Sequence, residues 1–389
     1  MSLVVFIYVL IVVFLFPQYG LGRISTTLII PAGFLITTFI NKKKLLAVIN
    51  SKPILLYALF TLISLMSISY SLNTSIAVES ASKALIVLFF SISIFSIGSS
   101  SLRLYKTLLV TGSLIPILLF FTIIFGEVNL SLIDRDENLM DPNYYGYFSF
   151  IGISSLFILK SIKNNLVIRI GIVCLILISF FFSIVNASRA TFIITIIISF
   201  LGYFFDVLSS GNSKLKIFFY SLILSLIILF IYDNFSNNLL DQLLFKRFES
   251  LETVESPRQF HTRKAIEIGL QNPVFGVGAG NYSIVPKRIE FGSFSHNTFT
   301  EIFANFGFIG LSLYLYLLYI VFKRLKNRLR NKHIFKSHFI IQLLVVFFVF
   351  QVYSIFYVVY LDTLFMFLFS IILSGLYFSK SDLELKNNK

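Results

Sequence analysis

The sequence LVIRIGIVCLILISFFFSIV, residues 166–185, decides the fold class, because its twenty residues carry a single charge, on Arg169. An α-helix rises 1.5 Å per residue, so a run of this length crosses the ~30 Å hydrocarbon core of a bilayer. Comparable apolar runs recur along the chain, and we expect about 12 of them to be membrane spans. The expected spans lie near residues 2–16, 21–40, 53–70, 76–98, 104–125, 143–160, 166–186, 189–206, 215–232, 296–322, 337–357 and 360–378.

The composition supports the same class of protein. Of the 389 residues, 57% are hydrophobic and 13% are charged, whereas about 25% of the residues of a soluble domain are charged. The short alternating segments that are typical of a transmembrane β-barrel are not seen in the sequence. We therefore predict an all-α, polytopic integral membrane protein of about 12 transmembrane helices, in which residues 1–389 form a single transmembrane domain.

The formal net charge of +14 is explained by membrane topology. The basic residues fall mainly in alternate loops, as the positive-inside rule requires, so no nucleic-acid partner is expected. A cytoplasmic N-terminus keeps the dense basic run over residues 323–332 inside and places the acidic turn at 134–137 outside. We interpret the first apolar segment as a retained helix, because it lacks the basic start and the cleavage site of a signal peptide.

One external connection, residues 233–295, is long, and it is expected to carry short helices. Apolar residues at helical spacing over 238–248 predict a helix that lies along the membrane interface. A second helix is predicted from Arg258 to Gln271, with Pro257 at its first turn and Pro273 ending it.

Two arginines, Arg189 and Arg258, lie at expected helix ends, where binding of an anion would account for a positive side chain. Arg189 lies between two expected spans at the outer face, where it either snorkels to the surface or opens a helix that binds an anion. Arg258 lies at a predicted helix N-terminus; it is either a solvated surface residue or the partner of an anion, since the helix dipole disfavours a cation there. Arg263, about one turn further, is expected to meet lipid head groups and is also counted as a candidate substrate contact.

A glycine-rich segment, Pro273-Val-Phe-Gly276-Val-Gly278-Ala-Gly280-Asn281, follows the second loop helix. It lacks the strand–turn–helix setting of a dinucleotide-binding motif. Two interpretations stay open: a plain turn, or a turn whose backbone N–H groups point at phosphate oxygens. We count Gly278, Gly280 and Asn281 as candidate substrate-binding residues.

The pair His296-Asn297 opens the tenth expected span and is the strongest candidate for chemistry. A neutral imidazole can take a proton from a hydroxyl near pH 7, so His296 is a candidate general base, with Asn297 as a substrate contact beside it. His261, His333 and His338 lack this setting and receive no role. The four histidines are spread out, with no Asp or Glu at ligand spacing, so we expect no metal site and no cofactor.

Weaker candidates lie elsewhere. Asp141-Pro142-Asn143 stands at the mouth of the sixth expected span, where it is predicted to cap the helix, and Asn143 is also counted as a substrate contact. Tyr144, Tyr145 and Tyr282 are candidates for stacking against sugar rings.

The ordered set of motifs resembles the O-antigen ligase and polymerase family. The motif-bearing region covers residues 186–322, and two of its positions depart from the family pattern. Pro257 stands where a glycine is usual before the loop arginine, and Thr262 stands where an aromatic residue is usual. The motifs that carry the resemblance are Ser188-Arg189-Ala190, Pro257-Arg258 ahead of Asn272–Tyr282, and His296-Asn297 followed, after nine intervening residues, by Gly307-Phe-Ile-Gly310.

The resemblance implies a glycan on a polyprenyl (undecaprenyl) diphosphate carrier in the outer leaflet of a bacterial inner membrane, transferred without metal to an acceptor sugar hydroxyl. Arg189 and Arg258 would hold the diphosphate and stabilise it as a leaving group. His296 would orient or deprotonate the acceptor hydroxyl. Both chain termini would be cytoplasmic and the active site extracytoplasmic.

Three functions stay open at this point. A ligase would attach finished polysaccharide to lipid A–core in lipopolysaccharide biosynthesis, and we favour it. A polymerase would extend repeat units of an O-antigen or capsule polysaccharide on the carrier. A flippase or other transporter of lipid-linked oligosaccharides would place charged residues along a cavity at the bilayer midplane, whereas these candidates gather at one mouth of the spans. The expected partners are the carrier-linked donor, a lipid A–core or carrier-linked acceptor, and membrane lipids.

Overall fold

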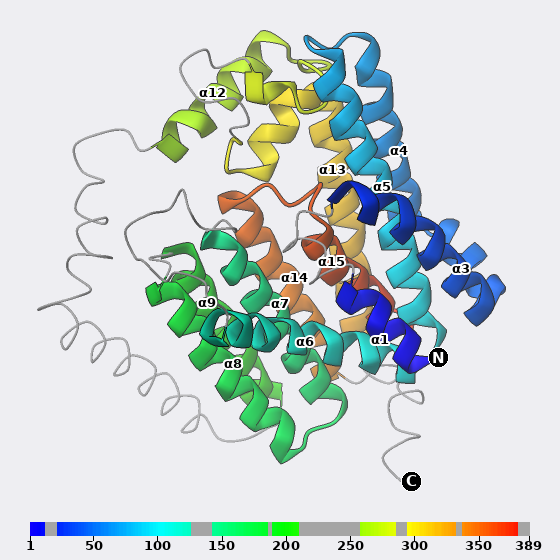
Figure 1. The fold of residues 1–389 in the computed structure, drawn as a ribbon, viewed down its shortest axis with the longest axis vertical. Helices are drawn as coiled ribbons and strands as arrows, with labels where there is room; N and C mark the ends of the chain where they lie inside the picture. The colour runs from blue at the N-terminus through cyan, green and yellow to red at the C-terminus, as the bar shows by residue number, and fades with distance from the viewer. Residues whose placement is uncertain are drawn as a thin grey trace, which may run out of the picture.

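The computed structural model describes residues 1–11, 22–125, 142–185, 189–209, 257–284, 294–331 and 337–379, and within them all regular secondary structure is helical (Figure 1). The predicted span near 215–232 and the predicted interfacial helix over 238–248 lie outside the described residues. The helices are α1 (Ser2–Leu10), α3 (Gly22–Ile49), α4 (Lys52–Met66), η2 (Ser67–Ser69), α5 (Thr74–Ser100), α6 (Leu102–Phe125), α7 (Pro142–Ile162), α8 (Leu166–Val185), α9 (Arg189–Ser209), α12 (Pro257–Gln271), η4 (Asn281–Ile284), α13 (Thr298–Arg330), α14 (Ser337–Phe356) and α15 (Thr363–Gly375).

The all-α, polytopic membrane class is confirmed. Six helical segments of the described chain are long and apolar enough to cross a bilayer: α4 with η2, α5, α6, α8, α13 and α14. Three shorter apolar segments lie within α7, α9 and α15. The count of about 12 spans stays a prediction.

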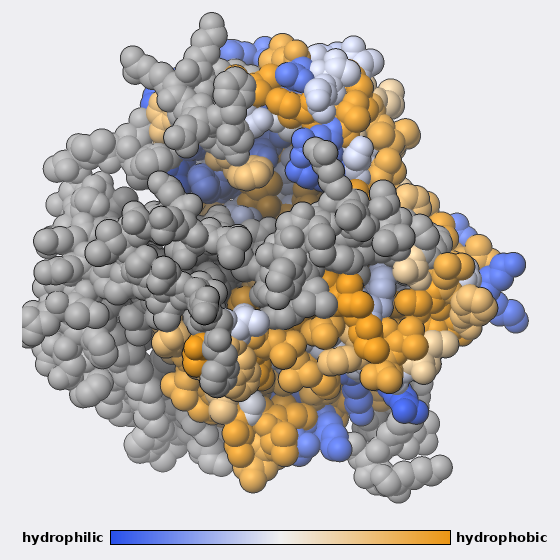
Figure 2. Space-filling model, in the orientation of Figure 1, coloured by the Kyte–Doolittle hydropathy of each residue, from blue (hydrophilic) through white to orange (hydrophobic). Residues whose placement is uncertain are grey.

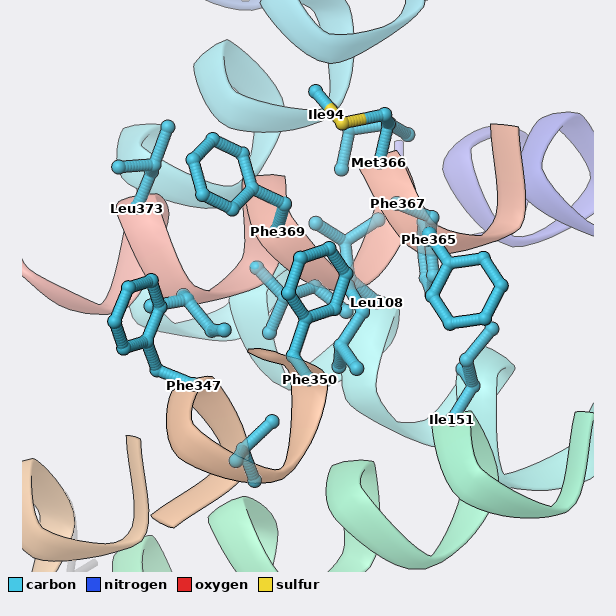
Figure 3. Packing of buried hydrophobic residues seen from close by; sticks show 14 of the residues in the cluster. Ile94, Leu108, Ile151, Phe347, Phe350, Phe365, Met366, Phe367, Phe369 and Leu373 are labelled. Atoms are coloured by element: carbon cyan, nitrogen blue, oxygen red, sulfur yellow. The ribbon is translucent and has the colours of Figure 1, made fainter. Parts of the chain in front are cut away.

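Helix α15 forms the centre of the hydrophobic core, because every residue from Leu364 to Gly375 is buried. It packs against α5, α6, α7 and α14, and Figure 3 shows its Phe365 and Phe369 beside Phe350 of α14. Small residues let α15 approach α5 closely. The Ser370 hydroxyl donates to the carbonyl of Ser91 in α5 at 3.3 Å. The Ser374 hydroxyl donates to the carbonyl of Phe95, also in α5, at the same distance.

Two predicted spans differ from the observed helices for local reasons. α15 has 13 residues, about 20 Å of helix, which is shorter than the predicted span 360–378. It starts late because the side chain of Asp362 accepts hydrogen bonds from the amides of Leu364 and Phe365 and so caps the helix. α3 runs past the predicted end at residue 40, but Asn41 is extended and divides it into two helical pieces.

The ends of the helices fall into two groups. At the end that carries α12, the α4–α5 turn meets the segment after α12, where the Asn281 side chain accepts a hydrogen bond from the Asn73 amide at 2.6 Å. At the opposite end, Lys160 of α7 pairs with Asp206 of α9 at 2.8 Å, and His338 of α14 lies 3.9 Å from the same carboxylate. Figure 1 shows α12 and the start of α13 at the top, with the α7–α8 turn at the bottom.

Candidate functional site

Helix α13 is interrupted near its start, and a neighbouring loop supplies hydrogen-bond partners for the peptide groups at the interruption. Gly307 has φ 61° and ψ −159°, which interrupts the helical hydrogen bonds that the predicted continuous span 296–322 would have had. Residues 273–278 supply the missing partners. The amides of Phe308 and Ile309 donate to the carbonyls of Pro273 and Val274, at 2.7 and 3.4 Å; the carbonyls of Ala304 and Asn305 accept from the amides of Val277 and Gly278, at 3.0 and 2.9 Å.

This pairing explains two glycines of the sequence motif. Gly276 has φ 68°, a conformation that is costly for a residue with a Cβ atom. A Cβ on Gly276 would also collide with the backbone of Asn305 and Phe306, and a Cβ on Gly307 would collide with the backbone of Val274. Both positions need glycine because two backbones approach each other there.

The other face of the loop is bonded to the α4–α5 turn. The amide of Ala279 donates to the Ser67 hydroxyl at 2.9 Å, and the Tyr70 hydroxyl donates to the Phe275 carbonyl at 3.0 Å. The amides of Gly276 to Ala279 therefore all donate to acceptors within the protein. This arrangement favours a structural turn over a phosphate-binding turn, so we assign Gly278, which is buried, to the scaffold.

Asn281 corrects a prediction from the sequence. Its side chain has no exposed surface. Its oxygen accepts from the Asn73 amide at 2.6 Å, and its nitrogen donates to the Ala279 carbonyl at 3.0 Å. Both ends of the amide are thus used internally, and the residue joins the loop to the start of α5 rather than facing a substrate. Gly280, with φ 69°, packs against Ser80 of α5.

His296 has the one positive φ among the non-glycine residues of the described chain, 56°. Its neighbours hold it there. The Ser295 hydroxyl donates to the Asn297 carbonyl at 2.8 Å and accepts from the Asn297 amide at 3.2 Å, so a tight turn closes around His296. The Ser295 amide donates to the buried Glu301 carboxylate at 2.8 Å. A strained backbone that its surroundings maintain is typical of functional sites.

Asn297 and Thr298 anchor the same turn to the helices. The Asn297 side chain caps α13 by accepting from the amides of Phe299 and Thr300, at 2.9 and 3.2 Å. The Thr298 hydroxyl donates to the Tyr357 carbonyl at 2.6 Å and accepts from the Val359 amide at 3.0 Å. The segment that carries His296 is therefore fixed to the connection between α14 and α15. For Asn297 the observed contact is a helix cap, and its predicted substrate contact stays a prediction.

Helix α12 packs across the His296 turn, and its boundaries confirm the helix predicted over 258–271. The Thr262 hydroxyl donates to the Ser295 carbonyl at 3.1 Å. Thr262 is thus the position where α12 meets the turn, although it departs from the family pattern in lacking an aromatic ring. The ring centroid of His261 lies 5.9 Å from that of His296, with the planes at 75°.

His261 received no role from its sequence setting, yet it is the histidine that lies beside His296. Its side chain is buried, with 4% of its surface exposed. Its Nδ1 lies 3.0 Å from the hydroxyl of Tyr282, which is also buried and so does not stack on a sugar. Burial lowers the pKa of His261 below its usual 6.5. The helical spacing to Arg258 was the signal that would have found it, since residues i and i+3 share one face of a helix.

Arg258 and Arg263 have different surroundings on α12. Arg258 is exposed in the first turn of the helix and has no acidic partner among the described residues. Arg263 lies 3.7 Å from Glu267 and stacks over the Phe260 ring. Lys264 hydrogen-bonds the same carboxylate at 2.6 Å and thereby lowers the pKa of Glu267. Arg263 therefore shares one carboxylate with Lys264 on the solvent side of α12, whereas Arg258 pairs with no carboxylate of the described residues.

Arg189 begins α9, and its side chain lies outside the described part of the structure, as does that of Asn143 in α7. The backbone nevertheless places the start of α9 at the α12 end of the bundle. A Cβ on Gly146, in the first part of α7, would meet Thr191 of α9 and Tyr353 of α14. The next residue of α7, Tyr147, has its ring centroid 4.3 Å from that of Tyr357, whose carbonyl accepts the Thr298 bond.

The surface near α12 differs from the rest of this face of the molecule. Figure 2 shows hydrophilic residues in a hollow below α12, whereas hydrophobic residues dominate the lower half of the view. Within the described residues, no three His, Cys, Asp or Glu side chains lie close enough to hold a metal ion. Among the described residues, the groups available for chemistry here are thus an imidazole pair, the exposed guanidinium of Arg258 and hydroxyls.

Comparison with known proteins agrees with this location. Residues 171–315, more than a third of the chain, match the family model described as O-antigen ligase. The matched region includes Arg189, Arg258 and His296 and overlaps most of the motif-bearing region 186–322, so the resemblance drawn from the sequence is confirmed. No curated protein matches the chain.

Proposed function

We propose that this protein is a membrane glycosyltransferase that moves a glycan from a polyprenyl diphosphate carrier to a sugar hydroxyl at the extracytoplasmic face of a bacterial inner membrane. We favour the O-antigen ligase form, in which the acceptor is lipid A–core. The polymerase form, in which the acceptor is a carrier-linked glycan, is the alternative. The match of residues 171–315 to the O-antigen ligase model supports both forms.

The observation that supports the proposal is that α12, which carries Arg258 in its first turn, packs on the turn of His296. Thr262 bonds to Ser295, and His261 lies 5.9 Å from His296 between ring centroids. Arg258 precedes His261 by three residues, so the two side chains lie on neighbouring positions of one helical face. An exposed cation thus lies about one helical turn along α12 from the histidine that contacts the candidate base, at one end of the bundle.

The proposed reaction is a single displacement. The acceptor oxygen attacks the anomeric carbon of the donor sugar, and the bond from that carbon to the diphosphate oxygen breaks. His296 takes the proton of the acceptor hydroxyl. The diphosphate leaves with the electron pair, and Arg258, together with Arg189, stabilises the charge that develops on it. One displacement inverts the configuration at the anomeric carbon.

The transporter alternative is less well supported by the described structure. A transporter would hold its substrate with charged groups near the middle of the bundle. Here the partly buried ion pair Lys160–Asp206 and the groups around His296 lie at opposite ends, and α15 fills the middle with phenylalanine and leucine side chains.

The test uses purified protein, a polyprenyl diphosphate-linked glycan and an acceptor glycan. We expect transfer with inversion of configuration, and losses of about 10²–10³-fold in Arg258→Ala and His296→Ala. Arg258→Lys should recover only part of the rate, because an ammonium cannot make two parallel hydrogen bonds. Arg330→Ala, which removes an exposed arginine at the far end of α13, is the matched control. Full transfer by both alanine variants of the site would reject the proposed roles.

Ligase and polymerase differ in what a deletion strain accumulates. Loss of a ligase leaves long glycan chains on the carrier and none on lipid A–core. Loss of a polymerase leaves single repeat units on both. Electrophoresis of lipopolysaccharide beside the carrier-linked glycan therefore decides between the two forms.

A further inference from the structure

We propose that His261 is a positioning residue for His296 and that Tyr282 fixes its ring and its tautomer. This inference rests on the proposed function, because the role concerns the base of that reaction. The site as described so far has one base and its cations. The buried pair His261–Tyr282 lies directly behind the base and is not used by those steps.

The first step of the argument is the tautomer of His261. The Tyr282 hydroxyl has one hydrogen, and its shorter contact, 2.8 Å, is to the His261 carbonyl oxygen. The hydroxyl then accepts at its oxygen from the ring, 3.0 Å away, so Nδ1 of His261 carries the hydrogen. Nε2 keeps the lone pair. The neutral ring is thus held in one tautomer and one orientation.

Tyr282 is itself held rigidly. It is 1% exposed, and its amide donates to the side-chain oxygen of Asn305 at 2.9 Å. Asn305 lies in the short first part of α13, just before the break at Gly307, and its side-chain nitrogen donates to the Tyr360 hydroxyl at 3.4 Å. The orientation of His261 is therefore determined by three segments that are distant in the sequence.

The second step is the effect on His296. The rings stand edge to face at 75°, which limits the rotation of the His296 imidazole toward α12. Charge matters as well. Two unit charges ~6 Å apart in a protein site repel enough to lower the basicity of the second group roughly 100-fold. His296 accepts a proton readily only while His261 is neutral, and burial keeps it neutral.

The other charged groups near this pair come from two helices. Burial raises the pKa of the Tyr282 hydroxyl, and the charge of Glu301 in α13 raises it further. The hydroxyl therefore stays protonated. On α12, Arg258 lies three residues before His261, and Arg263 and Lys264 share the single carboxylate of Glu267 on the exposed side, which leaves one net positive charge there. The local charges that oppose protonation of His261 are therefore those of Arg258, of the Arg263–Lys264–Glu267 group and, when it is protonated, of His296 itself.

The experiment compares side chains that imitate one ring nitrogen each. The amide nitrogen of asparagine occupies the place of Nδ1, and that of glutamine occupies the place of Nε2. We expect His261→Asn to retain most of kcat, while His261→Gln and His261→Ala lose about tenfold or more with KM for the donor unchanged. Tyr282→Phe should resemble His261→Gln. Tyr319→Phe removes a hydroxyl from an exposed tyrosine of α13 and is the control.

Thermal unfolding of each variant separates positioning from folding. A purely structural role predicts that kcat falls in step with the midpoint of unfolding and that asparagine and glutamine do equally well. Either that pattern, or unchanged kcat in His261→Ala and Tyr282→Phe, overturns the proposal.

A readout that needs no transfer distinguishes this inference from the proposed function. Carbethoxylation by diethyl pyrocarbonate, followed by mass spectrometry, reports the neutral, accessible imidazole. We expect His261 to react slowly in the wild type and several-fold faster in Tyr282→Phe, with no change in Tyr319→Phe. If the wild type transfers no glycan but shows this pattern, the proposed function fails and the pairing stands. Equal rates in wild type and Tyr282→Phe reject the pairing itself.

Discussion

At the scale of single residues, the structure describes in most detail the groups that hold His296 in its turn. The clearest is Glu301, a carboxylate that is 5% exposed in the first turn of α13. It accepts the Ser295 amide at 2.8 Å and thereby fixes the turn in which His296 has a positive φ. Glutamine at this position keeps an acceptor oxygen of the same reach, whereas leucine has none.

We predict that Glu301→Leu is destabilising by about 1–3 kcal/mol, because it leaves the buried Ser295 amide without an acceptor. Glycan transfer should fall in parallel, since the His296 turn relaxes. Glu301→Gln should be close to wild type in both respects. Thermal unfolding in detergent and a transfer assay measure the two effects. Equal losses in the two variants would show that the charge, and not the acceptor, is what the turn requires.

His261 should make stability depend on pH in a defined direction. Burial lowers the pKa of His261 in the folded protein. As the pH falls through about 6.5, His261 therefore binds a proton in the unfolded state but stays neutral in the folded state. Stability is therefore complete above that pH and decreases below it, down to the folded pKa. The midpoint of thermal unfolding should fall less between pH 7.5 and pH 5.5 in His261→Asn than in the wild type. Identical pH dependence in the two proteins would contradict the assignment.

The residues of the site were only partly predictable from the sequence. Arg258 and His296 could be chosen because a charged or titratable group at a helix end in an apolar chain is unusual. The spacing of His261 from Arg258 was visible in the sequence, but the contacts of His261 and Asn281 were not, because each side chain bonds to a partner far away in the sequence. His261 bonds to Tyr282, and Asn281 bonds to Asn73.

At the scale of elements, the decisive feature is the break in α13. Pattern analysis predicted one continuous helix there, since the hydropathy around Gly307 does not change. The break is visible only in the backbone, where residues 273–278 replace the helical partners of four peptide groups. By contrast, α12 was predictable, because Pro257 and Pro273 mark its two ends in the sequence itself.

We predict that Gly276→Ala and Gly307→Ala each lower the free energy of unfolding by more than about 1 kcal/mol, because φ is positive and the new Cβ meets backbone atoms. Transfer should be lost with the fold of the site. Gly171→Ala in α8 is the matched control, since its Cβ would meet only the end of the Leu156 side chain at 3.3 Å. If the two site variants unfold at the same temperature as the control, the backbone pairing does not limit stability.

At the scale of the whole molecule, the described contacts agree with the alternation of loops predicted from charge. The loops expected outside meet one another, as Asn73 and Asn281 do, and the ends expected inside meet one another, as Lys160 and Asp206 do. Run length and charge therefore predicted which ends share a side. The order in which the helices pack could not be derived from them, because apolar faces carry no signal for a particular partner.

The orientation itself is open to a direct test. Cys174 is the single cysteine, so Cys174→Ser provides a background without thiols. In that background we expect Gln271→Cys, at the end of α12, to react with a membrane-impermeant maleimide in right-side-out vesicles. Arg330→Cys, at the far end of α13, should react only after permeabilisation. Both positions are exposed, so access to the reagent depends on the side of the membrane. The reverse pattern would place the His296 turn in the cytoplasm.

Four backbone amides form the hydrogen bonds between residues 273–278 and α13, and we expect all four to exchange their hydrogens together. Val277, Gly278, Phe308 and Ile309 are protected from deuterium only while the two stretches of chain stay together. Separation of these stretches would release all four at once, so they should exchange as one cooperative unit. Because the same separation would free the start of α13, the opening rate read from these amides would also be the rate at which His296 leaves its strained turn.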